Sequence, residues 1–355
     1  LVMFGFTWYQ SKQYEKQMEA QAQLDSIAMV EQMAAMALDS ARRAEGILTE
    51  GESAGVTVKN LPAYKDSLLT EARLAQEGIY KLSNDKMNVE FTTRGAQLFS
   101  VKLNDYKAYD STDLYLVKPE HSEYGVTVFA GENINTKDFV FQVAEHNDST
   151  IVMQLPFAQG GYIQQKYTLP KDSYMVHNEL SFVGMEDLIP RNVSMLDIDW
   201  SLVVPRLEKG YKNEMQYSKL NYYFSGDKKP EMIGRGRDGS KRVDTKMKWF
   251  AFQQQFFSAI MTSSADEFSS ADLAVDFYSE DEYKAEGNLM ACTAKLRSNF
   301  QAGSGSVTIP YDFYFGPNDY RGLKEYDMKY EKIIPLGGWL VGWFSRLVII
   351  PCFDF

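Results

Sequence analysis

The chain has few of the residues that build metal and redox sites. Its 355 residues include only two cysteines, Cys292 and Cys352, and three histidines. The cysteines form no CxxC pair and are too few for a disulfide framework. The histidines, His121, His146 and His177, lack the HxxxH or HExxH spacing that places two imidazoles on one helix face. We therefore expect no metal centre and no cofactor.

Positive charge is also scarce. The chain has 37 lysines and arginines against 48 acidic residues, a net charge of −11 and a pI near 5.0. Proteins that bind nucleic acid normally carry a basic surface, so we exclude nucleic acid as a partner. The hydrophobic fraction of 45% is sufficient for a large core. The length favours one large domain with extensions, or two domains.

Neither apolar end of the chain is long enough to cross a bilayer, which takes about 20 residues. The first nine residues, LVMFGFTWY, end in Trp8-Tyr9 and are followed directly by polar Gln10. This order is typical of a membrane helix that leaves through the interfacial aromatic belt. We interpret residues 1–9 as the end of a transmembrane helix. A truncated signal peptide is the alternative, although no small-residue cleavage site follows.

Residues 10–77 are predicted to form a helical stalk and linker. Between Tyr9 and Ile47 there is no proline, and apolar side chains recur at steps of three and four along a weak stripe. The linker contains a second, shorter helical segment, LLTEARLAQE, at residues 68–77. The pattern favours a solvated spacer. A coiled-coil or partner-binding helix, as in a stalked adaptor of an envelope complex, is the alternative.

The periodicity changes from helical to alternating after Gly78. In the clearest run, Leu196, Ile198 and Trp200 alternate with polar residues, and turn clusters such as residues 302–305 separate such runs. About fifteen or more short strands without helical interludes predict an antiparallel all-β domain over residues 78–318. That number is too large for one flat sheet, so we expect two large packed sheets.

Two helical segments are predicted after this domain. Residues 319–334 show helical spacing, and residues 335–355 form the apolar sequence PLGGWLVGWFSRLVIIPCFDF. On a helix, the small and polar residues of this second segment share one narrow face. Its roughly 15 helical residues would be about 22 Å long, which suits the plane of the membrane interface; a helix buried in the core is the alternative. The predicted membrane-interface residues are Trp339, Leu340, Trp343, Phe344, Arg346, Leu347, Val348 and Ile350.

Three segments resemble the periplasmic domain of the YidC-type insertases, bacterial members of the Oxa-type family of membrane protein insertases. They are KLSNDKMNVEFTTRGAQLFSVKLNDYKAYD at 81–110, WFAFQQQFFSAIMTSS at 249–264 and FYFGPNDYRGLKEY at 313–326. The third is the most specific, and the resemblance covers about residues 78–355. One departure is Gly95-Ala96, where the family usually has Gly-Gly, and it affects local turn geometry.

The resemblance implies a β-supersandwich related to galactose-mutarotase-like folds, with C-terminal helices, on the periplasmic side of the bacterial inner membrane. It implies a tethered domain of an insertase and chaperone that works alone or with the Sec translocon. The lipid bilayer, Sec components and nascent inner-membrane proteins would be its partners. The segment 335–355 would lead to a second membrane span. In the family, the helical end matters more for insertion than the sandwich, and the membrane groove with its arginine matches no residue here.

One basic segment is a candidate contact site. Residues 234–239 match GxGxxG, but the sequence lacks the preceding buried strand and following helix that a dinucleotide-binding loop requires. We interpret this segment as a mobile basic loop that contacts anionic lipid or an acidic partner. The residues of this loop are Arg235, Arg237, Lys241 and Arg242.

A cluster of aromatic residues allows two interpretations. The rings lie in or just after a predicted strand, so they could line a groove for an unfolded peptide or fill the sandwich core. The residues concerned are Trp249, Phe252, Phe256 and Phe257.

Catalysis has little support in the sequence. Asp197 and Asp199 are two residues apart on a predicted strand, so their carboxylates would be roughly 7 Å apart on one face, within the range of glycosidase pairs. Their alternation with apolar residues is, however, typical of a solvated outer face. A mutarotase site needs histidine acids beside a carboxylate base, and three scattered histidines do not supply it. We predict that the chain is not an enzyme; a carbohydrate-binding or carbohydrate-converting sandwich is the alternative.

Overall fold

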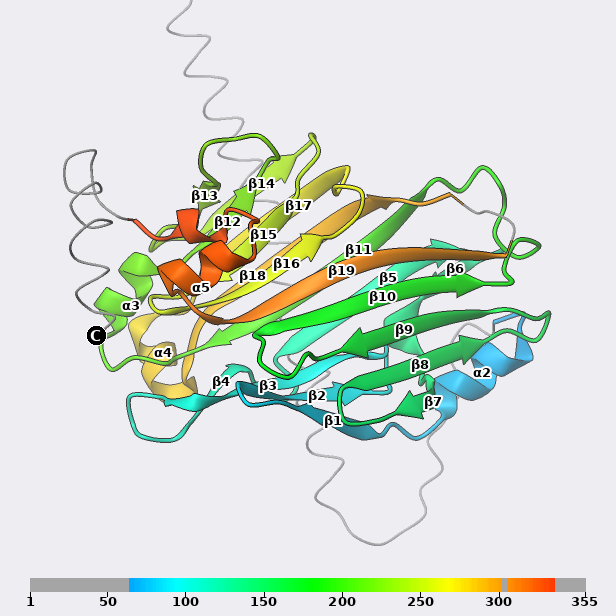
Figure 1. Ribbon diagram of the computed structural model, residues 1–355, viewed down its shortest axis with the longest axis horizontal. Helices are drawn as coiled ribbons and strands as arrows, with labels where there is room; N and C mark the ends of the chain where they lie inside the picture. Colours follow the sequence, from blue (N-terminus) through cyan, green and yellow to red (C-terminus); the bar gives the residue numbers. More distant parts are fainter. Residues whose placement is uncertain (1–63, 302–304, 336–355) are drawn as a thin grey trace, which may run out of the picture. The chain divides into compact units, whose positions relative to one another are not determined.

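The computed structural model describes residues 64–301 and 305–335 (Figure 1). The predicted membrane segment at 1–9, the long helix of the stalk and the predicted interfacial helix from residue 336 onward lie outside the described residues. Within the part that is described, no helix combines the length and the apolar content needed to cross a membrane.

The largest layer is a nine-stranded antiparallel sheet. It forms one face of the molecule in Figure 1, with β19 at its centre. In spatial order its strands are β13 (Glu231–Ile233), β12 (Lys219–Tyr223), β15 (Trp249–Gln253), β16 (Phe257–Ser263), β19 (Ser306–Pro317), β10 (Met175–Val183), β9 (Tyr162–Thr168), β8 (Thr150–Pro156) and β7 (Gln142–His146).

A six-stranded antiparallel sheet forms the second large layer, so the expected pair of packed sheets is confirmed. A separate four-stranded sheet, which the sequence pattern does not distinguish, pairs the first four strands. The six-stranded order is β14 (Gly239–Val243), β17 (Ser270–Phe277), β18 (Asn288–Asn299), β11 (Met195–Pro205), β5 (Ser122–Phe129) and β6 (Asn133–Asn135). The four-stranded order is β1 (Ile79–Ser83), β2 (Met87–Thr92), β3 (Gln97–Lys107) and β4 (Asp113–Val117).

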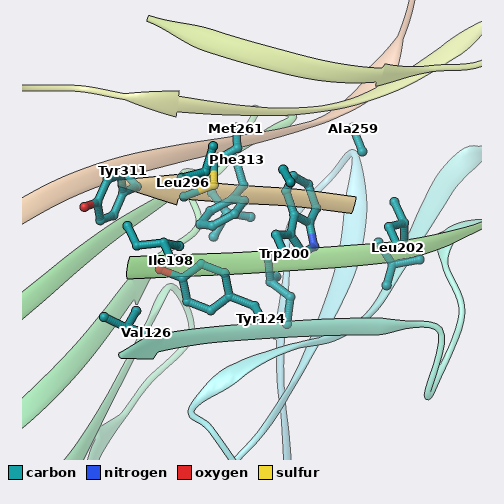
Figure 2. Close-up of a cluster of buried hydrophobic side chains, with 14 of the residues drawn as sticks. Tyr124, Val126, Ile198, Trp200, Leu202, Ala259, Met261, Leu296, Tyr311 and Phe313 are labelled. Carbon is teal, nitrogen blue, oxygen red and sulfur yellow. The ribbon is translucent and has the colours of Figure 1, made fainter. Parts of the chain in front are cut away.

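Alternating apolar residues hold the two large sheets together. Trp200 on β11 is 1% exposed and packs against Phe252 of β15 and Phe313 of β19, with ring centroids 4.9 and 5.5 Å apart. Figure 2 shows this cluster, in which side chains from both sheets point toward one another. Because successive side chains of a strand point to opposite faces, the alternation at residues 196–204 buries one face of β11 and exposes the other.

The turn at Gly95-Ala96 has a left-handed backbone at both positions. The φ angles are +73° at Gly95 and +47° at Ala96, a conformation that favours glycine. The surrounding fold stabilises this conformation at Ala96. The residue is fully buried, and its carbonyl accepts a hydrogen bond from the Tyr167 hydroxyl over 2.8 Å. The departure from Gly-Gly therefore leaves a left-handed turn in place.

The helices are short, and the C-terminal ones, α5 and η2, pack against the nine-stranded sheet. The Asp66 carboxylate caps α2, and its Leu69 is buried in the core. The single helix expected at 319–334 is instead two pieces separated by Asp327 and Lys329, whose φ angles of +52° and +64° do not fit a continuous helix. The helical elements are α2 (Ser67–Leu74), η1 (Thr136–Asp138), α3 (Tyr211–Tyr217), α4 (Glu280–Glu286), α5 (Tyr320–Glu325) and η2 (Tyr330–Ile333).

Candidate functional site

The C-terminal helices pack on the outer face of the nine-stranded sheet through a second hydrophobic cluster, distinct from the main core. Leu323 of α5 and Tyr330 and Ile333 of η2 are at most 2% exposed there. We call this cluster the C-terminal junction. Its buried members are Met175, Tyr223, Trp249, Ala251, Ile260, Tyr314, Leu323, Tyr330 and Ile333.

Trp249 is the central side chain of the junction. Its ring stacks on Tyr223 at 5.3 Å and meets the edge of Tyr330 at 5.4 Å. Its indole nitrogen donates a hydrogen bond to the Met328 carbonyl over 2.7 Å. The second segment that carries the family resemblance therefore contacts the residues that follow the third segment.

Gly316 allows the backbone of β19 to approach two tyrosines. A Cβ atom at this position would lie 2.6 Å from the Tyr314 hydroxyl and 2.8 Å from Cγ of Tyr174. Such distances are far shorter than van der Waals contact, so no side chain fits without displacement of these rings. The Tyr314 hydroxyl donates to the carbonyl of Pro317 over 2.6 Å, which fixes the end of the strand.

Asn318 joins the end of β19 to the turn between β15 and β16. Its amide nitrogen donates to the carbonyls of Gln254 at 3.0 Å and Phe257 at 3.2 Å, and its oxygen accepts from the Ser258 hydroxyl at 2.6 Å. The next residue, Asp319, caps α5 by accepting from the Gly322 amide at 2.6 Å. The GPND sequence thus ends the strand, crosses to a neighbouring turn and starts the helix.

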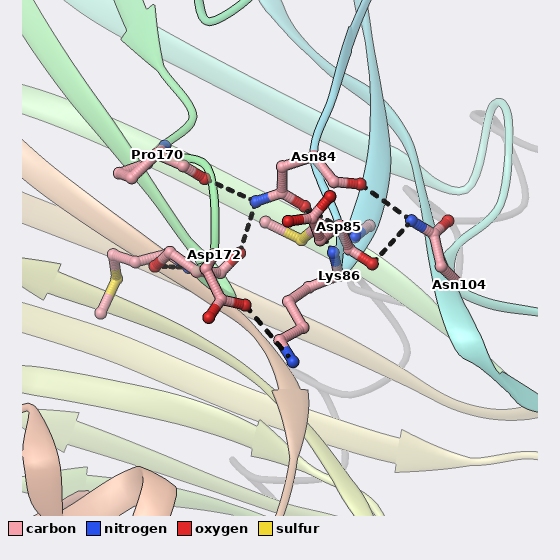
Figure 3. Close-up of polar contacts among 9 residues, drawn as sticks. Asn84, Asp85, Lys86, Asn104, Pro170 and Asp172 are labelled. Atoms are coloured by element: carbon pink, nitrogen blue, oxygen red, sulfur yellow. Dashed lines mark hydrogen bonds and ion pairs between the residues drawn. The ribbon is translucent and has the colours of Figure 1, made fainter.

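The first family-like segment contacts the turn between β9 and β10, as Figure 3 shows. The Asn84 side chain donates to the carbonyls of Pro170 at 2.6 Å and Ser173 at 2.8 Å, and Lys86 pairs with Asp172 at 3.3 Å. The residue after Ser173, Tyr174, is the ring that faces Gly316. All three segments therefore converge on the point where α5 begins.

A polar group beside the junction resembles a hydrolase triad in composition only. The Asp312 carboxylate bonds to Nδ1 of His177 at 2.6 Å and also accepts from the Ser264 hydroxyl. The hydrogen bond to Asp312 raises the pKa of His177. In a Ser-His-Asp triad the imidazole must contact the serine to remove its proton. Here the carboxylate lies between the two, so this arrangement does not activate the hydroxyl.

Asp197 makes a cross-strand ion pair on the outer face of the six-stranded sheet, and Asp199 lies opposite Lys295 of β18. Asp197 pairs with Arg297 at 3.1 Å, with both side chains exposed. Burial raises the pKa of Asp199, whereas the nearby Lys137 lowers it. Opposite charges directly across a sheet stabilise strand pairing. The geometry supports the interpretation of these carboxylates as part of a solvated face.

The four candidate groove aromatics do not meet on one surface. Trp249 is buried in the junction, whereas Phe252 and Phe257 belong to the main core at 1% and 6% exposure. Phe256 alone is open to solvent, at 52% exposure. The structure favours the core interpretation for the three buried rings, because their faces are already covered by the chain itself.

The candidate basic loop connects β13 at the edge of one large sheet to β14 at the edge of the other. Its Gly234 and Gly236 both have positive φ angles, and a Cβ at Gly234 would lie 2.0 Å from Cγ1 of Val275. The Gly236 amide donates to the Ser218 carbonyl at 3.3 Å. The loop has defined backbone contacts, and a strand rather than a helix follows its GxGxxG sequence. The candidate contact residues Arg235, Arg237, Lys241 and Arg242 are all exposed.

A polar cavity of about 270 Å³ was not predicted from the sequence. Arg206 on its wall lies between the rings of Tyr109, 4.1 Å away, and Tyr283, 4.5 Å away. The cavity draws its lining from three distant segments, so no local spacing indicates it. Lining residues include Tyr109, Asp110, Tyr115, Lys118, Arg206 and Glu286.

Behind this wall lies the buried carboxylate of Glu214 on α3. It accepts hydrogen bonds from the Leu207 amide at 2.9 Å and the Tyr283 hydroxyl at 2.6 Å. Burial raises the pKa of Glu214 to about 7, despite these hydrogen bonds. The side chain has no exposed surface, so it serves as a structural link between α3 and α4 rather than as a group that reaches a ligand.

Comparison with known proteins identifies relatives over the whole chain. The family model of the YidC periplasmic domain matches residues 79–350. The chain is 28% identical to membrane protein insertase YidC of Porphyromonas gingivalis strain W83, over 100% of the chain and 57% of that protein. It is also 28% identical to the protein of the same name from Phocaeicola vulgatus, over 99% of the chain and 56% of that protein. The chain thus spans just over half the length of these curated relatives.

Solved structures with similar arrangements include two from lactobacilli. A galactose mutarotase-like protein from Lactobacillus casei has a TM-score of 0.43 and 11% identity, over 67% of this chain and 100% of its own. A galactose mutarotase related enzyme from Lactobacillus acidophilus has a TM-score of 0.42 and 8% identity, over 67% and 97%. At the level of sequence, the family model covers most of the chain, including all three segments that meet at the C-terminal junction. The chain belongs to the YidC periplasmic domain family.

Proposed function

We propose that this chain is the periplasmic part of an insertase that assists insertion and folding of inner-membrane proteins. Its relatives are named membrane protein insertases. The observation that carries the proposal is the convergence of three family-like segments on the C-terminal junction, which fixes the chain at Pro335. Trp249, Leu323 and Tyr330 are buried together and pack the residues before Pro335 against the sheet.

The proposed mechanism is positional rather than catalytic. The segment after Pro335, for which the sequence predicts a membrane-interface helix, would bring the sandwich to the outer surface of the inner membrane. A rigid junction then holds the sandwich at a set place beside the inserting protein. The bilayer and nascent inner-membrane proteins are the proposed partners, together with Sec translocon components. The runner-up function, carbohydrate binding, would use the face that carries Asp197 and Asp199.

The full-length protein in its bacterial host provides the test. We expect a Trp249→Ala, Asn318→Ala double variant to impair growth and to reduce membrane insertion of a reporter protein when the wild-type copy is depleted. The matched control, Asp197→Asn with Asp199→Asn, alters two polar residues on the other sheet and should support normal insertion. Equal insertion by the junction variant, at equal protein abundance, would contradict the proposal. Binding of a glycan that Asp197→Asn abolishes would support the runner-up instead.

A further inference from the structure

Cations concentrate on the turns that flank β13, on β14 and just after β14. Six of these residues, which we call the basic patch, are exposed in a chain whose net charge is −11. Within the described residues none of the six makes an ion pair. The basic patch consists of Lys228, Lys229, Arg235, Arg237, Lys241 and Lys246.

Three of the four acidic side chains in residues 227–246 make contacts within the fold. Glu231 accepts from the Tyr222 hydroxyl at 2.5 Å, and Asp238 accepts from the amide of Phe277 at 2.7 Å. Asp244 pairs with Arg242 at 2.9 Å, which leaves Arg242 outside the patch. Residues 227–246 contain seven lysines and arginines against four acidic residues, so the segment keeps a net charge of +3 in an acidic chain.

A buried lysine and an exposed apolar side chain lie beside the patch. Burial lowers the pKa of the neighbouring Lys219, and the charge of Arg235 lowers it further. Met232, on β13 within the same segment, is 49% exposed. An apolar side chain among unpaired cations is a combination that suits the interface between water and lipid headgroups.

The patch lies next to the C-terminal junction. β13 pairs with β12, whose last residue, Tyr223, stacks on Trp249 of the junction. The Tyr223 hydroxyl also donates to the carbonyl of Asp227, directly before Lys228, over 3.0 Å. In Figure 1, β12, β13 and α5 lie at the same end of the sandwich. The basic patch therefore lies at the same end of the sandwich as the C-terminal junction.

We propose that the basic patch binds the anionic headgroups of the membrane surface and so orients the sandwich on it. This inference rests on the proposed function, which places the domain beside a membrane, and adds a specific contact face. Each lysine or arginine near an anionic surface strengthens binding by about fivefold. Because the remainder of the domain is acidic, the opposite orientation is repelled. Contact through the patch would leave the other faces of the sandwich free.

Vesicle co-sedimentation of the purified chain tests this face. We expect stronger binding to vesicles of phosphatidylglycerol and phosphatidylcholine than to phosphatidylcholine alone, and a decrease as salt shortens the screening length from about 10 Å at 0.1 M. The triple variant Lys228→Gln, Lys229→Gln, Arg235→Gln should bind the anionic vesicles on the order of 100-fold more weakly. The matched control removes two lysines and one arginine from other exposed positions: Lys81→Gln, Lys171→Gln, Arg191→Gln.

The affinity of the control triple for anionic vesicles should stay within about threefold of wild type. Its net charge changes as much as that of the patch variant, but its basic patch is intact. Equal losses in both triples would overturn the inference, as would unchanged binding by the patch variant. A separate variant, Trp339→Asp with Trp343→Asp, should weaken binding to both kinds of vesicle, since it tests the predicted interfacial helix. Unchanged vesicle binding by the patch variant, together with reduced reporter insertion by the junction variant, would overturn the patch and leave the proposed function standing. Weaker vesicle binding by the patch variant, together with normal insertion by the junction variant, would do the reverse, so the two proposals fail independently.

Discussion

The indole nitrogen of Trp249 donates a hydrogen bond to the main-chain carbonyl of Met328, 2.7 Å away. Met328 lies between Asp327 and Lys329, whose left-handed backbones separate α5 from η2. A carbonyl at such a break has no helical partner, so it needs another donor. The tryptophan supplies this donor from the sheet, and one side chain thereby fastens the irregular part of the C-terminal segment to β15.

A Trp249→Phe variant should loosen the C-terminal segment selectively. Phenylalanine keeps an aromatic ring between Tyr223 and Tyr330 but leaves the Met328 carbonyl without its donor. We expect the C-terminal segment to lose about 1–3 kcal/mol of stability against local opening. This loss would be measured as faster hydrogen exchange across residues 320–333. Trp200→Phe is the matched control, since it removes the indole bond to Ser122 in the main core. Faster exchange at 320–333 in the control alone would contradict the assignment.

Gly316→Ala should destabilise the junction by steric conflict. The new methyl group would lie 2.6 Å from the Tyr314 hydroxyl, and overpacking of this kind costs about 1–3 kcal/mol. Urea unfolding of the purified chain measures the effect. Gly210→Ala is the control, because the nearest atom to its Cβ would be 3.8 Å away, and we expect a cost of less than about 1 kcal/mol. Equal costs at the two positions would rule out the close approach.

Asp319 is expected to act as a helix cap rather than as a charged contact. Its carboxylate accepts a hydrogen bond from the Gly322 amide at the start of α5. Asp319→Ala should therefore cost about 1 kcal/mol, whereas Asp319→Asn, which keeps an accepting oxygen, should cost a few tenths. Thermal unfolding distinguishes these outcomes. A similar loss in both variants would show that the charge, and not the cap, is what matters.

The buried carboxylate of Glu214 predicts a specific pH dependence. Its pKa is about 7 in the folded chain and 4.5 as the ordinary value, so the folded state holds the proton more tightly. Between these values the unfolded state loses its proton first, and the free energy of unfolding falls as pH rises. The stabilisation is fully present below pH 4.5 and is lost through pH 7, by roughly 3 kcal/mol in total.

Glu214→Gln should remove this dependence, because the amide stays neutral and can still accept from Tyr283. Urea unfolding at pH 5 and pH 8 provides the measurement. We expect the variant to gain stability relative to wild type at pH 8, and to differ little from it at pH 5. If the variant and the wild type differ in free energy of unfolding by the same amount at pH 5 and at pH 8, the assigned titration of Glu214 is contradicted.

The sheet body was predictable because its residues follow the period of a strand. Alternation at residues 196–204 indicates β11 and its buried face correctly, with Trp200 in the core. Alternation does not tell which sheet a strand joins, so β1–β4 could not be recognised as a separate layer. The break between α5 and η2 was hidden for a similar reason. Asp327 and Lys329 are not glycines, and Tyr320, Leu323 and Tyr330 still recur at helical spacing.

The sequence indicated the segments that form the C-terminal junction but not the contacts between them. The segments at 249–264 and 313–326 were identified by resemblance, but nothing local shows that they touch. Trp249 and Phe252 have opposite parity on β15, which places them on opposite faces, yet the sequence does not say which face the helices cover. The cavity at Arg206 and the link at Glu214 depend on contacts between distant segments, and these follow only from the fold.

The most direct test of the positional account leaves every described side chain intact. In the full-length protein, a flexible Gly-Ser segment of about ten residues placed after Pro335 would uncouple the junction from the segment that follows. Reporter insertion into proteoliposomes should then slow markedly, while unfolding of the sandwich stays unchanged and the same segment placed in the exposed turn at Gly160 has no effect. Normal insertion with the junction uncoupled would contradict the claim that the sandwich works by being held in place.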